Sequence, residues 1–160
     1  KMKKLVKVLS LLALSIVVCL GVVAFAACSG EDAKTYKGEY SYKSYGHTYG
    51  MVVNVSVADG KITKVEDITG NTYVSVSTPP EGNEDWTDAS VKNWKDNLPK
   101  LLKEYEGKTV EEVKALTATI KGVEEATENK VSDSNLVITD ATQGSARLLL
   151  AVQNALKDVK

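Results

Sequence analysis

The stretch LVITDATQGSARLLLAVQNAL, residues 136–156, organises the expected fold of the whole chain. Its first three residues are apolar and favour a short strand, and residues 139–145 are small or polar and favour a tight turn. Apolar side chains then recur at helical spacing, at Leu149, Val152, Leu156 and Val159. The stretch therefore predicts a strand, a turn and a C-terminal helix in direct succession.

The start of that helix has two interpretations. A strand that leads through a tight turn into a helix directs free backbone N–H groups and a partial positive charge at one point, which suits an anion such as phosphate. The alternative is an ordinary helix start, in which the side chain of Asp140 or Thr142 caps the first turn and no ligand binds.

The first half of the domain has the pattern of antiparallel strands. Residues 36–42, YKGEYSY, alternate aromatic and polar side chains, as a half-buried strand does. A turn is expected next, marked by Tyr45, Gly46, Tyr49 and Gly50. The following strand alternates again, with Met51, Val53, Val55 and Val57 on one face.

A hairpin joins this strand to its successor, because Asp59-Gly60 is a strong two-residue turn signal. The return strand is expected to hold Ile62, Val65 and Ile68. Since Ile62 and Val65 have opposite parity, the strand either contains a bulge or is covered on both faces.

Residues 71–88 are the least regular part of the chain and include the break PPEG at 79–82. A connection of this length is more often functional or mobile than structural. Its Trp86 could stack on a planar ligand or pack in the core, and the same two possibilities hold for Tyr45, Tyr49 and Tyr73.

Helices are expected after this connection. Val91, Trp94 and Leu98 share one helical face, with Trp94 in the core, and Pro99 is expected to start a renewed helix that ends at Gly107. A capping box at residues 109–112, TVEE, then begins another helix with Val113 and Leu116 inward. Residues 117–134 are polar and predict either a short strand or a helix over 123–128.

The N-terminus has the layout of a secretory signal. Four lysines within residues 1–7 precede 23 uncharged residues, 8–30. Ala26-Ala27-Cys28 resembles a bacterial lipobox, in which Cys28 becomes the lipidated first residue of the mature chain. An uncleaved transmembrane anchor is the alternative, because such a run can cross a bilayer of about 30 Å. We expect a signal peptide at 1–27, a tether at 28–35, one domain at 36–160, and a location outside the cytoplasm at the membrane.

The composition of residues 28–160 excludes several classes of function. Four of the 20 basic residues and none of the 21 acidic ones precede Cys28, so this part carries a net charge of −5, which argues against nucleic acid. His47 is its one histidine and Cys28 its one cysteine, so a His-based metal site, a disulfide or a Ser-His-Asp triad is not expected. Redox chemistry would need a borrowed cofactor.

Ala141-Thr142 followed by Ser145 and AVQNAL resembles the C-terminal end of FMN-binding domains, which occur in subunits of Rnf and sodium-translocating NADH:quinone reductase complexes and in bacterial lipoproteins. Their pattern is close to S/T-G-A-T-x-[ST]-S, and the Thr often carries FMN through a phosphoester bond. The resemblance extends to the N-terminal half, where Tyr36-Lys37-Gly38 and DGKITKV at 59–65 match a Y-x-G stretch and D-G-K-I-x-x-V.

The resemblance implies an α+β domain, with an antiparallel sheet packed against helices and a C-terminal helix whose N-terminus faces a pocket. It also implies electron transfer by bound FMN, attached covalently at Thr142 in the fullest form, and a membrane redox partner. The implied flavin-binding residues are Thr139, Asp140, Ala141, Thr142, Gln143, Gly144 and Ser145. Asp140 departs from the pattern, where Gly stands, and its charge is expected to weaken the phosphate contact.

Two other functions remain open. The chain could be a flavin-free binding or scaffolding lipoprotein of the same fold. The cleaved leader could itself be a signal, since residues 20–27 resemble the peptide pheromones released from some lipoproteins.

Overall fold

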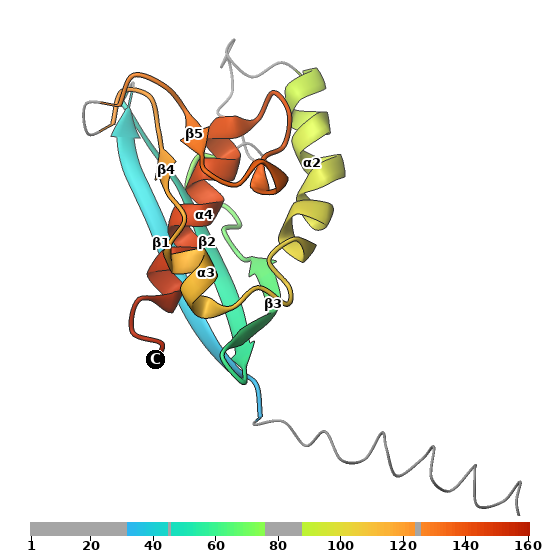
Figure 1. Ribbon diagram of the computed structural model, residues 1–160. Helices are drawn as coiled ribbons and strands as arrows, with labels where there is room; N and C mark the ends of the chain where they lie inside the picture. Colours follow the sequence, from blue (N-terminus) through green and yellow to red (C-terminus); the bar gives the residue numbers. More distant parts are fainter. Residues whose placement is uncertain (1–31, 45, 76–87, 124–125) are drawn as a thin grey trace, which may run out of the picture. The chain divides into compact units, whose positions relative to one another are not determined.

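An antiparallel three-stranded sheet forms one layer of the domain (Figure 1). The structure, a computed structural model, describes residues 32–44, 46–75, 88–123 and 126–160. The strands are β1 (Lys34–Ser44), β2 (His47–Ala58) and β3 (Lys61–Asp67), in the order β1-β2-β3. The helices pack against this sheet, which confirms the α+β class. Because β1 begins at Lys34, the last two residues of the expected tether belong to the sheet.

Alternation along the strands builds the inner face of the sheet. Tyr36, Tyr40 and Tyr42 of β1 are half-buried, and they pair with Val55, Met51 and Tyr49 of β2. The four apolar residues expected inward on the second strand are all buried: Met51, Val53, Val55 and Val57. Burial of these side chains on one face supplies the core on which the helices rest.

The return strand contains the bulge that the parity of its apolar residues allows. The register between β2 and β3 shifts at Ser56/Val57, so Ile62 and Val65 are both buried on the inner face. The strand ends at Asp67, and Ile68 is 42% exposed, so its expected place in the buried return strand is wrong. The hairpin itself is confirmed, with φ of 51° at Asp59 and 70° at Gly60.

Only part of the expected turn at residues 45–50 is a turn. Gly46 has φ of 77°, but β2 starts at His47, so Tyr49 and Gly50 lie within a strand. Gly50 serves packing instead, because a Cβ there would lie 2.6 Å from Cδ2 of Tyr73. The ring of Tyr73 thus covers the strand where a glycine leaves room for it.

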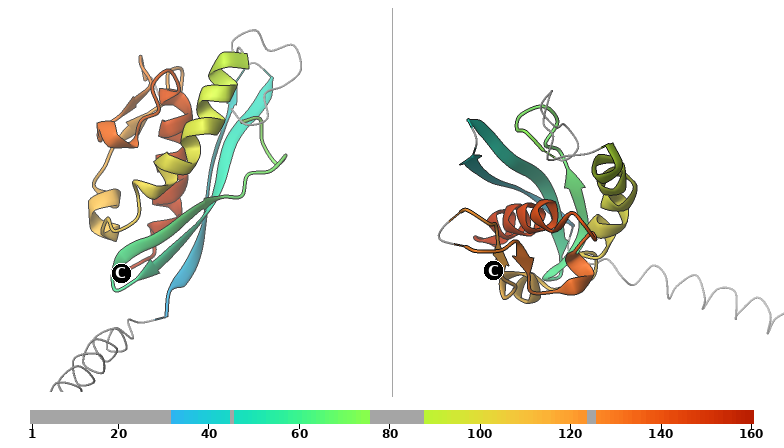
Figure 2. Two further views of the ribbon diagram at one scale, coloured as in Figure 1. Left: turned by 90° about the vertical axis from the view of Figure 1, so that its right-hand side faces the viewer. Right: turned by 90° about the horizontal axis from the view of Figure 1, so that it is seen from above.

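Helix α4 (Thr142–Leu156) crosses the inner face of β1 and β2, and α2 lies on the same side of the sheet (Figure 2). The apolar face of α4 is buried as expected, at Leu149, Val152 and Leu156, and Val159 beyond the end of α4 is also buried. Gly38 of β1 lies directly under this helix. A Cβ at residue 38 would be 2.0 Å from the carbonyl oxygen of Ala151, so a side chain of any size would push the helix off the strand.

Helix α2 (Asp88–Lys103) is one continuous helix, and the expected break at Pro99 is wrong. Pro99 is exposed, so the carbonyl group that loses its hydrogen bond can be hydrated. Trp94 and Leu101 hold the helix through its buried side, with exposed fractions of 0% and 3%. The core position of Trp94 is therefore confirmed. The turn after the helix ends with Gly107 at φ of 83°.

Short elements complete the fold. The capping box before α3 (Val110–Lys114) is present, with the Glu112 N–H donating to the Thr109 hydroxyl at 3.1 Å and the Thr109 N–H to the Glu112 carboxylate at 2.7 Å. Residues 117–134 form the strand alternative, because β4 (Ala118–Thr119) pairs with β5 (Lys130–Val131).

The approach to α4 differs from expectation. Leu136 belongs to a 3-10 turn, η1 (Ser134–Leu136), and residues 137–141 are irregular, so the expected strand at 136–138 is wrong. Asp133 caps η1 by accepting from the Asn135 N–H at 3.0 Å. The apolar run is still buried, at Leu136 and Ile138, but as core-filling loop rather than as sheet.

No helix within the described residues is long and apolar enough to cross a membrane. The expected leader and Cys28 lie outside the described residues, as do Tyr45 and residues 76–87 with Trp86.

Replacing Gly38 by Ala should lower the free energy of unfolding by about 3 kcal/mol or more, because the new Cβ meets helix backbone that cannot move aside. Urea denaturation measures this change. Lys37→Ala, an exposed substitution next to it on β1, is the control and should stay within about 0.5 kcal/mol of the native chain. Equal stability of Gly38→Ala and Lys37→Ala would contradict the close packing of β1 and α4.

Candidate functional site

The first turn of α4 has no side-chain cap. Its N-cap is Ala141, so neither Asp140 nor Thr142 caps the helix as the ordinary interpretation expects. The first helical hydrogen bond runs from the Ser145 N–H to the Ala141 carbonyl at 3.0 Å. The N–H groups of residues 142–144 precede it and have no helical acceptor. This leaves a partial positive charge at the start of α4.

A cavity of about 510 Å³ lies at this helix start. It is lined from three parts of the chain: the first turns of α2, the β4–β5 connection, and the start of α4. The lining residues are Ser90, Lys121, Thr127, Glu128, Asn129, Asp140, Ala141, Thr142, Gln143 and Gly144. The expectation that the N-terminus of the C-terminal helix faces a pocket is therefore confirmed.

Two of the seven expected site residues do not line this cavity. Thr139 lines a neighbouring cavity, and its carbonyl accepts from the Asn93 amide of α2 at 2.7 Å. Ser145 is fully buried, where its hydroxyl accepts from the Ile138 N–H at 3.0 Å and donates to the Ala141 carbonyl at 3.1 Å. Ser145 therefore stabilises the turn before α4 from inside, and its hydroxyl is used within the protein.

Asp140 occupies a backbone conformation that favours glycine. Its φ is 62°, in the left-handed region, which Asp and Asn tolerate better than most residues. This conformation turns the chain from Thr139 into the helix. The positive φ at residue 140 is a physical reason why the pattern that this segment resembles has Gly at this position.

Gly144 is required by the packing of α2 on α4. A Cβ at residue 144 would lie 2.7 Å from Cζ3 of Trp94. The indole ring thus lies against the first turn of α4 and holds it beside α2. A Ser or Thr, which the pattern has here, would collide with this ring.

The charges around the cavity are mixed. Lys121 brings one positive charge from the β4–β5 connection, while Glu128 and Asp140 bring two negative charges. The connection is held in shape by the Lys121 N–H donating to the Asn129 side chain and by the Thr119 hydroxyl donating to the Glu128 carbonyl, both at 2.9 Å. An anion at the helix start would be attracted by Lys121 and the helix and repelled by the two carboxylates.

An aromatic cluster with a buried arginine lies behind the first turns of α4. The rings of Tyr42 and Tyr49 stack with centroids 5.6 Å apart, and Gln143 interacts with the Tyr42 hydroxyl. Arg147 is 1% exposed and donates to the Val74 carbonyl at 3.4 Å. Burial lowers the pKa of Arg147 and raises the pKa of Tyr42, and the attraction between these two groups opposes both shifts.

Sequence reasoning missed the residues that the β4–β5 connection and α2 bring to the cavity, above all Lys121. Their polar segment carries no periodic signal that would place it against residue 142. The sequence could have predicted the buried position of Arg147, because it is a charged residue within the apolar run ARLLLAV. Such a residue must be paired or is buried at a cost in free energy. Among the described residues, no cluster of His, Cys, Asp and Glu could hold a metal ion.

No family model matches this chain, and no curated protein or solved structure matches it either.

The left-handed backbone at Asp140 predicts a pair of opposite stability effects. Asp140→Gly should raise the free energy of unfolding by up to about 1 kcal/mol, because glycine adopts this φ without a Cβ clash. Asp140→Ala should lower it by about 1 kcal/mol, although both variants remove the same charge. Urea denaturation of the two variants separates the backbone effect from the charge effect. Equal shifts in both would show that residue 140 contributes through its charge alone.

Proposed function

We propose that this protein is a membrane-anchored, extracytoplasmic lipoprotein that binds FMN for electron transfer. The proposal combines the sequence resemblance with the cavity at the start of α4. The observation that carries it is that five of the seven residues implied by the resemblance, 140–144, line one cavity at an uncapped helix start. These residues provide the donors that a phosphate group requires.

The cavity suits the group in size and in donors. Its volume of about 510 Å³ lies within the range of about 300–1,000 Å³ typical of small-molecule sites. The backbone N–H groups of Gln143 and Gly144 would hold the phosphate, and the Thr142 hydroxyl and Lys121 of the same lining could contribute. When bound, the isoalloxazine ring of FMN supplies the electron-accepting chemistry, and the protein orients and shields it.

The phosphate contact in this chain is weaker than the pattern alone implies. Asp140 and Glu128 both line the cavity and would repel an anion bound there. At about 5 Å and an effective dielectric near 20, one such repulsion is roughly 3 kcal/mol, and solvent at the exposed Asp140 reduces it. We therefore expect modest affinity for FMN and no spontaneous phosphoester at Thr142.

The same two carboxylates favour a second candidate function. A flavin-free binding or scaffolding lipoprotein would keep the fold and the cavity but need no anion site. In that case Asp140 would mark the loss of phosphate binding. The two functions differ in one measurable property, the affinity for FMN.

FMN fluorescence titrations should distinguish the two functions. The native chain should bind FMN, and Asp140→Gly should bind about tenfold more tightly because one repulsion is removed. Lys121→Gln should bind about tenfold more weakly, since the one positive charge in the lining of the cavity is lost. Lys130→Gln, an exposed charge on β5 outside the cavity, is the matched control and should bind like the native chain.

Thr142→Val completes this series. Thr142→Val should fold normally and should carry no covalent flavin. In the presence of a flavin transferase, the intact mass of Asp140→Gly would reveal a covalent adduct as an added FMN-phosphoryl group. The Thr142→Val substitution should prevent that adduct. Flat titrations for the native chain and for Asp140→Gly would reject FMN binding and favour the flavin-free function. Equal weakening by Lys121→Gln and Lys130→Gln would place the flavin elsewhere.

Anchoring depends on Cys28 and is tested separately. Cys28→Ala removes the lipid acceptor, so the variant should accumulate unprocessed or be released from the membrane. Cell fractionation with the apparent size on a gel measures both results. Cys19→Ala, at the one cysteine within the leader, is the control and should be processed normally. A Cys28→Ala chain that stays membrane-bound at the mature size would contradict lipid anchoring.

A further inference from the structure

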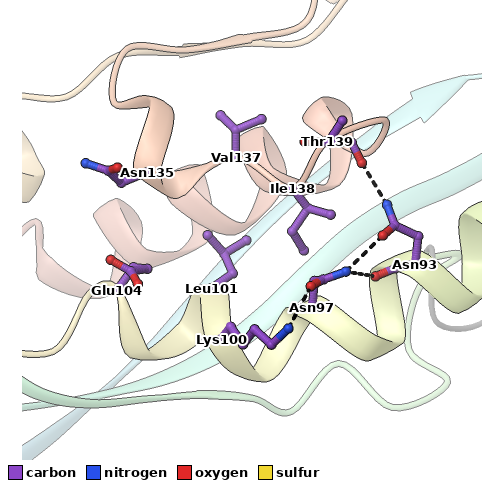
Figure 3. A pocket seen from close by; sticks show the side chains of 9 residues that line it. All are labelled: Asn93, Asn97, Lys100, Leu101, Glu104, Asn135, Val137, Ile138 and Thr139. Carbon is purple, nitrogen blue, oxygen red and sulfur yellow. Dashed lines mark hydrogen bonds between the residues drawn. The ribbon is translucent and has the colours of Figure 1, made fainter.

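A chain of side-chain donors on α2 ends at the peptide group just before Asp140 (Figure 3). The Lys100 ammonium donates to the Asn97 side-chain oxygen at 3.3 Å, and the Asn97 amide donates to the Asn93 side-chain oxygen at 2.8 Å. The Asn93 amide donates in turn to the Thr139 carbonyl at 2.7 Å. Because the oxygen of Asn93 accepts from Asn97, its nitrogen is the atom that faces Thr139.

The bond from Asn93 fixes the orientation of the peptide group between residues 139 and 140. The C=O and N–H of a planar trans peptide point in opposite directions. The N–H of Asp140 therefore points away from Asn93, since the Thr139 carbonyl points toward it. This N–H has no backbone acceptor among the described residues, so it remains available to a ligand.

Without that bond, residue 140 would favour the other orientation. Its φ is 62°, and a positive φ costs free energy for a residue that has a Cβ. If the peptide group between residues 139 and 140 turned over, φ of Asp140 would return to the negative range that L-residues prefer. The same rotation would carry the Thr139 carbonyl away from Asn93 and break their bond. The bond therefore opposes relaxation of the backbone at Asp140.

The next residue of α2 holds the chain on the far side of the same turn. A Cβ at Gly144 would lie 2.7 Å from Cζ3 of Trp94, so the indole ring rests against the first turn of α4. Asn93 and Trp94 thus contact the chain just before and just after residues 140–143, which line the cavity at the start of α4. Two neighbouring residues of one helix hold both ends of this turn.

We propose that Asn93 is a positioning residue for the anion site at the start of α4. By holding the Thr139 carbonyl, Asn93 keeps residue 140 at a positive φ and directs the Asp140 N–H toward the bound phosphate. Successive backbone N–H groups turned to one point form a concavity that binds anions. If the peptide group turned over, a carbonyl oxygen would replace this donor and repel the phosphate. The inference rests on the proposed function, because it assigns Asn93 a role in phosphate binding.

NMR spectroscopy of the ligand-free full chain in detergent tests the positioning directly. At a positive φ the amide and α hydrogens of a residue lie close together, so strong cross-relaxation between them marks this conformation. Residue 140 should show this signal in the native chain and lose it in Asn93→Ala. Lys95→Ala, an exposed substitution on α2 outside the lining of both cavities, is the control and should keep the signal. An unchanged signal in Asn93→Ala would overturn the proposal.

FMN titrations measure the consequence for binding. Asn93→Ala should weaken FMN binding about tenfold, and Lys95→Ala should leave it unchanged. In the Asp140→Gly background, Asn93→Ala should weaken binding only about threefold or less, because glycine gains nothing by leaving a positive φ. Equal weakening in the two backgrounds would show that Asn93 supports stability alone and would overturn the proposal. Flat titrations of the native chain and of Asp140→Gly would reject the proposed function, while the NMR comparison would still show whether Asn93 sets the backbone at residue 140.

Discussion

Helix α4 lies directly on β1 because residue 38 has no side chain. The burial of the helix against the sheet and the position of its first turn depend on that contact. The carbonyl of Ala151 and the N–H of Ala155 come within 2.0 and 2.5 Å of where a Cβ would stand. With the helix held at this depth, Leu149, Val152 and Leu156 are buried against the sheet. The helix then extends to a defined first turn. Strand β1 and helix α4, which are far apart in sequence, are in close contact because glycine stands at residue 38.

A second close contact fixes the other end of the helix. Trp94 packs on Gly144, so α2 lies beside the first turn of α4. The chain enters this turn through Asp140, whose backbone is in the left-handed conformation. The loop before α4 lines two cavities, one together with α2 and one together with the β4–β5 connection. Thr139 lines the first and Asp140 the second. Adjacent residues thus line two cavities of different chemistry, the one at Asp140 with a free helix start and the one at Thr139 with the side chains of Asn93 and Asn97.

Local patterns predicted most of the sheet and the capped helix start. Alternation at residues 51–57, the Asp59-Gly60 turn and the Thr109–Glu112 box are encoded by neighbouring residues, and each formed as expected. The failures came where distant packing decides. Pro99 remains helical because Trp94 and Leu101 anchor α2. Gly50 lies in β2, where it pairs with Ser41 and leaves room for the ring of Tyr73. Residues 140–144, which the resemblance implies, do line a cavity, but Lys121 of the same lining was not expected, because only the tertiary fold brings its segment to α4.

The crystal structure of the full chain grown with FMN tests the central claim most directly, because it locates the phosphate. The proposed function predicts phosphate oxygens about 2.7–3.2 Å from the backbone nitrogens of Gln143 and Gly144, with the Lys121 ammonium facing them. The flavin ring would then occupy the cavity that residues 140–144 line. Flavin bound at another surface, or a cavity without flavin in a crystal grown at saturating FMN, would contradict it.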